Sequence, residues 1–153
     1  MKLYLMQHAL AYPAEEKPER PLLPEGIDMA KKAAAGIRKL GLSFELIVTS
    51  SKRRSQQTAA LVAEGVRYPY SDILSSETVL PNASPQAVLD LLREEDCDSV
   101  LIVGHLPHLA KLASHTLNGA ELVFENTGLT CLELAGGDSA KLIFHLQAEQ
   151  LAR

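Results

Sequence analysis

The amino-acid sequence predicts an α/β fold, a three-layer sandwich in which helices cover both faces of a largely parallel central sheet. Runs of aliphatic residues recur along the chain with the composition of strands buried on both faces, at residues 2–7, 45–49 and 99–103. Segments with apolar residues at helical spacing lie between and after these runs, at residues 25–40, 52–64, 85–92 and 107–117. Because strands that alternate with helices usually pair in parallel, the pattern favours a sheet covered on both sides.

The first predicted strand is followed by a long loop. Residues 10–24 contain four prolines among charged side chains. Proline fixes φ and lacks a backbone N–H, so we expect an irregular surface loop there. A helix is predicted to begin at Glu25 and to end before Gly41, a natural stop residue.

The remaining elements follow from capping residues and short apolar runs. Ser50 offers an N-cap for the helix at 52–64, and Ser84 offers one for a helix with Pro85 at its first position. Residues 68–81 are ambiguous and leave a further strand open. The C-terminal part predicts three short strands, with a Gly-Gly-Asp turn before the last, at residues 121–124, 129–134 and 141–146.

The composition is that of one globular domain spanning residues 1–153, with 46% hydrophobic and 22% charged residues. No apolar run is long enough to span a membrane, and the N-terminal one is too short for a signal peptide. We therefore expect a cytoplasmic protein with no membrane partner, in which Cys97 and Cys131 stay reduced as small core residues. The net charge of −4 argues against a nucleic-acid partner.

Polar side chains follow three of the predicted strands. His8 comes after the first strand, Arg54 lies on the helix after the second, and His105 follows the third. The C-terminal ends of parallel strands meet at one edge of a sheet, where such folds bind their ligands. Helix N-termini add unpaired N–H groups, and arginine adds a planar fork that matches phosphate oxygens. The sequence therefore predicts an anion site with chemistry in it, built around these three residues.

A lone histidine at a strand end is more often a hydrogen-bonded loop residue than a catalyst, and the pairing of His8 with His105 is what favours catalysis. His108, His115 and His145 lack that placement. His115 lies late in a helix, where the helix dipole favours it. No carboxylate accompanies His108 and His115, so the sequence predicts no metal site.

These residues belong to four motifs that resemble those of the histidine phosphatase superfamily, in particular its small phosphohistidine phosphatase branch of the SixA type. The motifs occur in the family's order, as Gln7-His8-Ala9, Arg20-Pro21-Leu22 with Gly26, Ser50 with Arg54-x-x-Gln57-Thr58, and Gly104-His105-Leu106-Pro107. The resemblance covers nearly the whole chain. It implies a fold like that of phosphoglycerate mutase.

The resemblance also implies roles at the matching positions. His8 would be the nucleophile that takes the phosphoryl group onto its imidazole. Arg54 and Arg20 would bind the phosphoryl oxygens, and His105, protonated in the phosphate-bound state, would donate to them. The implied activity is a phosphatase that needs no metal and no cofactor. Its expected substrates are a protein phosphohistidine, another activated phosphoryl group or a small phosphate ester.

Gln7 departs from the family pattern, in which an arginine precedes the nucleophile. Glutamine still donates a hydrogen bond, but it has no charge and no guanidinium fork. Loss of a charged phosphate contact in a desolvated site costs about 2–4 kcal/mol of transition-state stabilisation. The alternative to a phosphatase is therefore a catalytically weak homologue that binds phosphate or a phosphorylated partner.

The sequence offers no clear carboxylic acid to protonate a leaving group. Glu77 precedes a Leu-Pro pair, while Glu15, Glu16 and Glu19 lie in the proline-rich loop, and each is expected to be a surface charge. A phosphoramidate such as phosphohistidine depends less on such an acid, because its leaving nitrogen can already carry a proton. This absence favours protein-borne phosphohistidine as the substrate.

Overall fold

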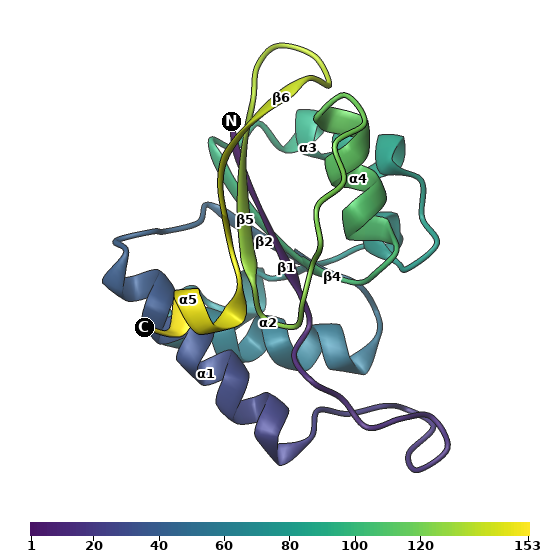
Figure 1. Ribbon diagram of the computed structural model, residues 1–153, viewed down its shortest axis with the longest axis vertical. Coiled ribbons are helices and arrows are strands. Elements are labelled where there is room, and N and C mark those ends of the chain that lie inside the picture. Colours follow the sequence, from purple (N-terminus) through teal and green to yellow (C-terminus); the bar gives the residue numbers. More distant parts are fainter.

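A computed structural model describes residues 1–153 and has helices on either side of a six-stranded sheet (Figure 1). The strands are β1 (Lys2–Gln7), β2 (Leu46–Thr49), β3 (Leu74–Ser75), β4 (Ser99–Gly104), β5 (Leu129–Leu134) and β6 (Ala140–Leu146). The α-helices are α1 (Pro24–Lys39), α2 (Arg53–Gly65), α3 (Pro85–Glu95), α4 (His108–Thr116) and α5 (Ala148–Ala152), with single 3-10 turns η1 (Tyr70–Asp72) and η2 (Glu77–Val79). None of these helices is long and apolar enough to cross a membrane.

The sheet has the strand order β3-β2-β4-β1-β5-β6. The first four strands in this order pair in parallel, whereas β5 pairs antiparallel with both β1 and β6. The predicted fold class, a largely parallel sheet between two helical layers, is therefore confirmed. The parallel pairs bring the C-terminal ends of β1, β2 and β4 to the same edge, with Gln7 beside Gly104 and Thr49 beside Val103.

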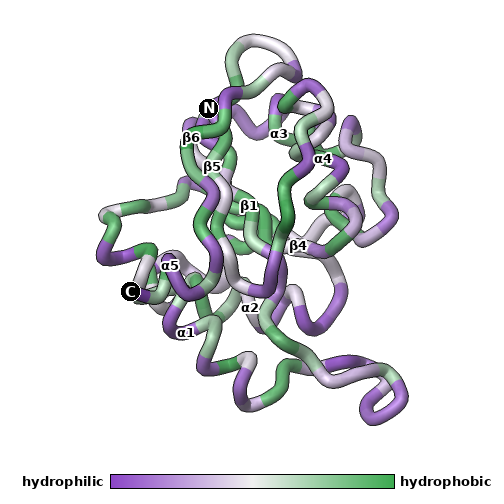
Figure 2. The backbone as a smooth tube through the Cα atoms, viewed as in Figure 1, coloured by the Kyte–Doolittle hydropathy of each residue, from purple (hydrophilic) through white to green (hydrophobic).

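The core lies in two layers, one on each face of the sheet. Along β1, Leu3 and Leu5 pack with buried residues of α3 and α4, while Tyr4 and Met6 pack with those of α1 and α2. This alternation follows from the two-residue period of a strand. In Figure 1, α1, α2 and α5 lie on one side of the strands and α3 and α4 on the other. Figure 2 shows hydrophobic residues concentrated on the central strands and hydrophilic ones at the tip of the loop after β1.

One predicted strand is wrong. Residues 121–124 join no ladder, although three of the four are apolar and of the types common in strands. β5, the next strand in sequence, has no free edge because it lies between β1 and β6, and at the edge strand β6 the Val123 carbonyl accepts from the His145 side chain and not from the backbone. The apolar residues of this segment, Leu122 and Phe124, pack instead onto the core layer that holds α3 and α4.

Two further elements complete the fold. The segment 68–81, in which the sequence left a strand open, contains β3, which pairs with the end of β2. The C-terminal helix α5 was not predicted, since its length of 5 residues is too short to show a helical period. It packs on α1, where the Leu151 carbonyl lies so close to Gly36 that a Cβ there would be 1.9 Å from its oxygen.

Candidate active site

His8 follows β1 directly, and its backbone N–H donates to the Gly104 carbonyl oxygen at 3.0 Å. The ring nitrogen Nδ1 lies 2.7 Å from the carbonyl oxygen of Ala9. A carbonyl can only accept, so Nδ1 carries the hydrogen and the lone pair of the neutral ring is on Nε2. His8 is 8% exposed, and the fixed tautomer turns an unprotonated nitrogen toward Arg54.

Arg54 reaches His8 from the first turn of α2. Its Nε donates to Nε2 of His8 at 3.3 Å. The preceding residue, Arg53, points about 100° away around the helix and pairs at the surface with Glu19, at 3.1 Å. Two neighbouring arginines thus have different environments, and only Arg54 is free of any acidic partner.

His105 follows β4 and lies next to His8, with 5.3 Å between the two ring centroids. Its Nε2 is 2.7 Å from the Ser50 hydroxyl, which also accepts from the backbone N–H of Lys52 at 3.1 Å. Either group can donate in the bond between Ser50 and His105, because a hydroxyl both donates and accepts and either nitrogen of a neutral imidazole can carry the hydrogen. Nδ1 of the His105 ring is buried and has no protein partner.

Arg20 approaches from the loop between β1 and α1. Its backbone has φ of 49°, and its Nε donates to the Tyr12 carbonyl at 2.9 Å. The loop is held in place at its end, where Gln57 of α2 accepts from the backbone N–H of Leu22 at 2.7 Å. Gly26 allows the return into α1, since a Cβ there would lie 2.0 Å from the Leu10 carbonyl oxygen.

Thr58 connects the nucleophile segment to α2. Its Oγ1 accepts from the backbone N–H of Ala9 at 2.9 Å and donates to the Arg54 carbonyl at 2.8 Å. The Gln57-Thr58 pair of the motif therefore holds two loop segments without facing the ligand pocket.

Asn126 is a pocket residue that the sequence did not reveal. Its Nδ2 donates to the His8 carbonyl at 2.8 Å, and the next residue, Thr127, donates its backbone N–H to the Gln7 carbonyl at 2.9 Å. The segment therefore crosses the end of β1 and closes the pocket on that side. A lone asparagine outside any motif gives no signal that could have identified it from sequence.

The five predicted site residues all line one pocket of about 310 Å3. Its wall consists of Gln7, His8, Leu10, Ala11, Arg20, Arg54, His105, Leu106 and Asn126. No carboxylate belongs to this wall, so its positive groups have no internal counter-charge. Burial and the nearby charge of Arg20 lower the pKa of Arg54, as expected where cations gather without an anion.

The histidines of the site are neutral in the free protein. Burial, assisted by the charges of Arg54 and Arg20 and opposed by the hydrogen bond to Ala9, lowers the pKa of His8 to about 4. Burial and the charge of Arg54 lower the pKa of His105 to about 3. At neutral pH both rings therefore hold one hydrogen, and His8 keeps the lone pair that a nucleophile needs.

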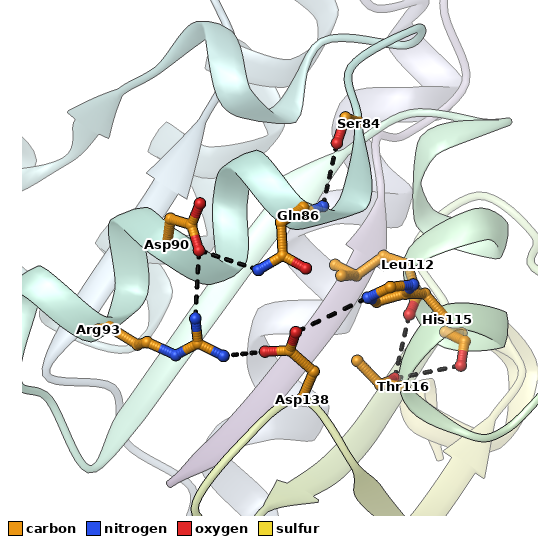
Figure 3. Close-up of polar contacts among 9 residues, drawn as sticks. Ser84, Gln86, Asp90, Arg93, Leu112, His115, Thr116 and Asp138 are labelled. Atoms are coloured by element: carbon orange, nitrogen blue, oxygen red, sulfur yellow. Dashed lines mark hydrogen bonds and ion pairs between the residues drawn. The ribbon is translucent and has the colours of Figure 1, made fainter.

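The other candidates from the sequence lie away from this wall. Nδ1 of His145 accepts a hydrogen bond from the Thr130 hydroxyl at 2.7 Å, and its Nε2 donates to the Val123 carbonyl at 3.0 Å. His115 contacts Asp138 near the opposite edge of the sheet (Figure 3). Glu77 is exposed and borders an adjoining hollow next to Arg54, and no group of three or more His, Cys, Asp or Glu is placed to hold a metal ion. Cys131 is buried and Cys97 half-buried, and both are free thiols.

The fold is that of an α/β protein with a cationic pocket, lined by two histidines and two arginines, at the C-terminal ends of its parallel strands. Residues 3–73 match the family model described as "Histidine phosphatase superfamily (branch 1)". An uncharacterised protein of Picosynechococcus is 31% identical over 119 residues, which are 74% of this chain and 71% of that protein. The chain belongs to the histidine phosphatase superfamily, branch 1.

Two of the similar proteins carry the name SixA. Phosphohistidine phosphatase SixA of Escherichia coli is 28% identical over 127 residues, 78% of this chain and 76% of the relative. The solved structure of a protein histidine phosphatase SixA complexed with tungstate superimposes with a TM-score of 0.89, at 22% identity, and covers 99% of both chains. The superposition shows a shared fold along the whole chain.

Proposed function

We propose that this protein is a metal-independent phosphatase that takes a phosphoryl group onto Nε2 of His8 and then passes it to water. The observation that carries the proposal is the fixed tautomer of His8. Its Nδ1–H is bound to the Ala9 carbonyl, and its unprotonated Nε2 faces a cationic pocket next to Arg54. A neutral imidazole held in this way can attack phosphorus without first losing a proton.

The pocket supplies the remaining parts of a phosphoryl transfer. Arg54 and Arg20 provide guanidinium groups for the phosphoryl oxygens, and Gln7 provides an amide N–H. Nδ1 of His105 is buried without a protein partner, and in the tautomer or the protonated form that has a hydrogen there it donates to another phosphoryl oxygen. Charge on these oxygens is redistributed in the transition state, where preorganised donors in a dry site contribute most.

The reaction proceeds in two displacements. In the first, the bond between His8 Nε2 and phosphorus forms while the bond from phosphorus to the substrate nitrogen breaks. That nitrogen keeps the electron pair, and the substrate imidazole leaves neutral because its other ring nitrogen already carries a proton. In the second, water attacks phosphorus, Nε2 of His8 leaves with the electron pair of the broken bond, and the two hydrogens of the water leave with the phosphate. The products are the dephosphorylated substrate and inorganic phosphate, and the enzyme returns to its starting state.

We propose protein-borne phosphohistidine as the substrate class. The pocket wall has no carboxylic acid to protonate an alkoxide, whereas the imidazole of a phosphohistidine leaves as a neutral group when its other ring nitrogen is protonated. The named relative from Escherichia coli is a phosphohistidine phosphatase, which supports the same substrate class.

Gln7 favours a second candidate function, a catalytically weak homologue that binds phosphate or a phosphorylated partner. The guanidinium that would sit beside the nucleophile is replaced by a neutral amide. Binding would then persist through Arg20 and Arg54, while transition-state stabilisation would fall.

One experiment separates the two candidates. The protein is incubated with a histidine-phosphorylated protein labelled with 32P, and separately with an aryl phosphate, and it is then quenched and examined for label. A phosphatase gives an acid-labile phosphohistidine at position 8 together with release of phosphate, and His8→Ala abolishes both. Phosphate binding without label and without release would reject the enzyme in favour of the binding protein.

A further inference from the structure

His108 is a buried histidine that neither the proposed reaction nor the fold explains. It is the first residue of α4, and it is 0% exposed. Both of its ring nitrogens are buried without a hydrogen-bond partner in the protein. A buried polar group left unpaired costs about 1–3 kcal/mol, so a partner from outside the chain is expected.

A second unpaired polar atom, the Oε1 of Gln7, is also buried. The amide nitrogen of Gln7 is not shut off from solvent in this way, so the NH2 end of the side chain is the one that opens on the phosphoryl pocket. The side-chain carbonyl of Gln7 therefore faces the protein interior, and its NH2 group faces the pocket.

His108 and Gln7 belong to the same side of the sheet. Leu3 and Leu5 of β1 face α3 and α4, and the two-residue period of the strand turns Gln7 the same way. Gln7 pairs in register with Gly104, the last residue of β4, after which the chain enters α4 within a few residues. The start of α4 packs against this point, since a Cβ on Gly104 would lie 3.4 Å from the Leu109 side chain.

The hydrogen-bonding capacities of the two groups complement each other. A neutral imidazole has one N–H donor, and a side-chain carbonyl is an acceptor. They do not contact each other directly, because neither atom has a partner within hydrogen-bonding distance. One water between them would accept from the His108 N–H and donate to Gln7 Oε1, the kind of bridge that buried waters form in proteins.

We propose that His108 positions Gln7: through one buried water it holds the Gln7 carbonyl and thereby directs the amide NH2 toward the bound phosphoryl group. The inference rests on the proposed function in that it needs a phosphoryl group in the pocket. His108 is a positioning residue, because it acts on the ligand only through Gln7. The site therefore depends on a residue that lies outside every catalytic motif.

The test measures binding of inorganic phosphate by calorimetry in a double-mutant cycle of His108→Leu and Gln7→Leu. We expect each single variant to weaken binding by about tenfold, the worth of a hydrogen bond to a charged group. The double variant should bind as the Gln7→Leu variant does, because the two side chains act as one unit. His108→Gln keeps an N–H donor and should restore most of the affinity, and His115→Leu on the same helix is the matched control.

A purely structural role for His108 predicts a different pattern. Replacing an unpaired buried histidine by leucine would then raise the melting temperature and leave phosphate affinity unchanged, which would overturn the inference. Affinity losses that multiply in the double variant would also overturn it.

A second readout does not depend on turnover or on phosphate. The side-chain NH2 signal of Gln7, assigned by its loss in Gln7→Leu, should shift in the 15N–1H spectrum of His108→Leu and stay in place in His115→Leu. An unmoved signal would reject the positioning role. Absence of label on His8, with the shift and the coupling both present, would instead reject the phosphatase reaction and leave the positioning of Gln7 intact.

Discussion

Two polar clusters at opposite edges of the sheet differ in how their charges are paired. At the far edge, Arg93 of α3 contacts Asp138 and also Asp90, the latter at 3.2 Å, and His115 lies 3.9 Å from Asp138 (Figure 3). Each positive group there has a carboxylate within the protein. At the active-site edge, Arg54 and the histidines have none.

The difference teaches which cluster is built for a ligand. A larger hollow of about 430 Å3 adjoins the far cluster, yet its one arginine is already neutralised by Asp138. The smaller pocket at the active site keeps unpaired cations, neutral histidines and unpaired buried polar atoms. Buried polar atoms and cations without a partner in the chain are unfavourable for the free energy of folding, and this indicates a binding partner from outside the chain. Paired surface charges contribute mainly to local structure.

The strongest way to break this comparison is His8→Ala. We expect turnover with a phosphohistidine protein to fall by about a thousandfold or more, because the covalent route is removed. Covalent labelling should disappear with it, while circular dichroism reports an unchanged fold. Residual labelling at another residue would mean that the nucleophile is misassigned.

Arg54→Ala sharpens the comparison within one helix turn, because Arg53→Ala is its natural control. Loss of an unpaired cation facing the phosphoryl oxygens should lower kcat/KM by about a hundredfold or more. Arg53 pairs with Glu19 at the surface, so its loss should change kcat/KM little. Equal losses in the two variants would show that the pocket's charge acts at long range and not through contact.

The pH dependence of stability tests the buried neutral histidines. Burial lowers the pKa of His108 from 6.5 to about 4, and those of His8 and His105 are lowered as well. Between these values the unfolded chain binds more protons than the folded one, so stability is full above about pH 6.5 and falls as the pH drops toward 4. In the original protein the free energy of unfolding should fall between pH 7.5 and pH 4.5. In His108→Leu this fall should be smaller by an amount on the order of 3 kcal/mol, as measured by urea unfolding at the two pH values. A pH profile identical to that of the original protein would contradict it.

Gln7→Arg adds a cation to a pocket that already holds two. We expect tighter phosphate binding and a kcat about tenfold higher, since a guanidinium fork gains charge and a second hydrogen bond. In this background His108→Leu should no longer affect phosphate binding. Phosphate affinity and kcat that both stay unchanged in Gln7→Arg would falsify the placement of side chain 7 toward the phosphoryl group.

The far cluster gives the smallest effect. Asp138→Asn removes the charge that Arg93 and His115 share, on a partly exposed surface. The melting temperature should change by no more than corresponds to about 1 kcal/mol, and kcat/KM should not change. A drop in activity would reveal communication between the two edges that the present contacts do not explain.

The sequence predicted the central strands and the convergence of the site residues because both depend on local patterns. Buried runs such as 99–103 are apolar throughout, and the ends of parallel strands share an edge. The chemical roles of His8, Arg54 and His105 stay predictions until the variants are measured.

What sequence could not predict depends on tertiary context. Residues 121–124 have the apolar residues of a short strand, but they pair with no strand, and their apolar side chains pack onto the core layer of α3 and α4. Asn126 reaches the pocket only because that segment crosses β1, and nothing in its neighbours marks it. His108 was set aside because it follows no strand, yet the end of β1 turns Gln7 toward the helix that carries it.

The hydroxyl of Thr58 has a consequence for how related sequences diverge. It binds the segment of the nucleophile and the turn of Arg54 at once, through Ala9 N–H and the Arg54 carbonyl. Serine is the one replacement that keeps both bonds, whereas valine, of nearly the same shape, keeps neither. A related protein with valine at this position would retain every residue that faces the ligand, but the segment of His8 and the turn of Arg54 would no longer be held together. Substitutions of Thr58 would thus be constrained by the geometry of the site, although its side chain takes no part in the chemistry.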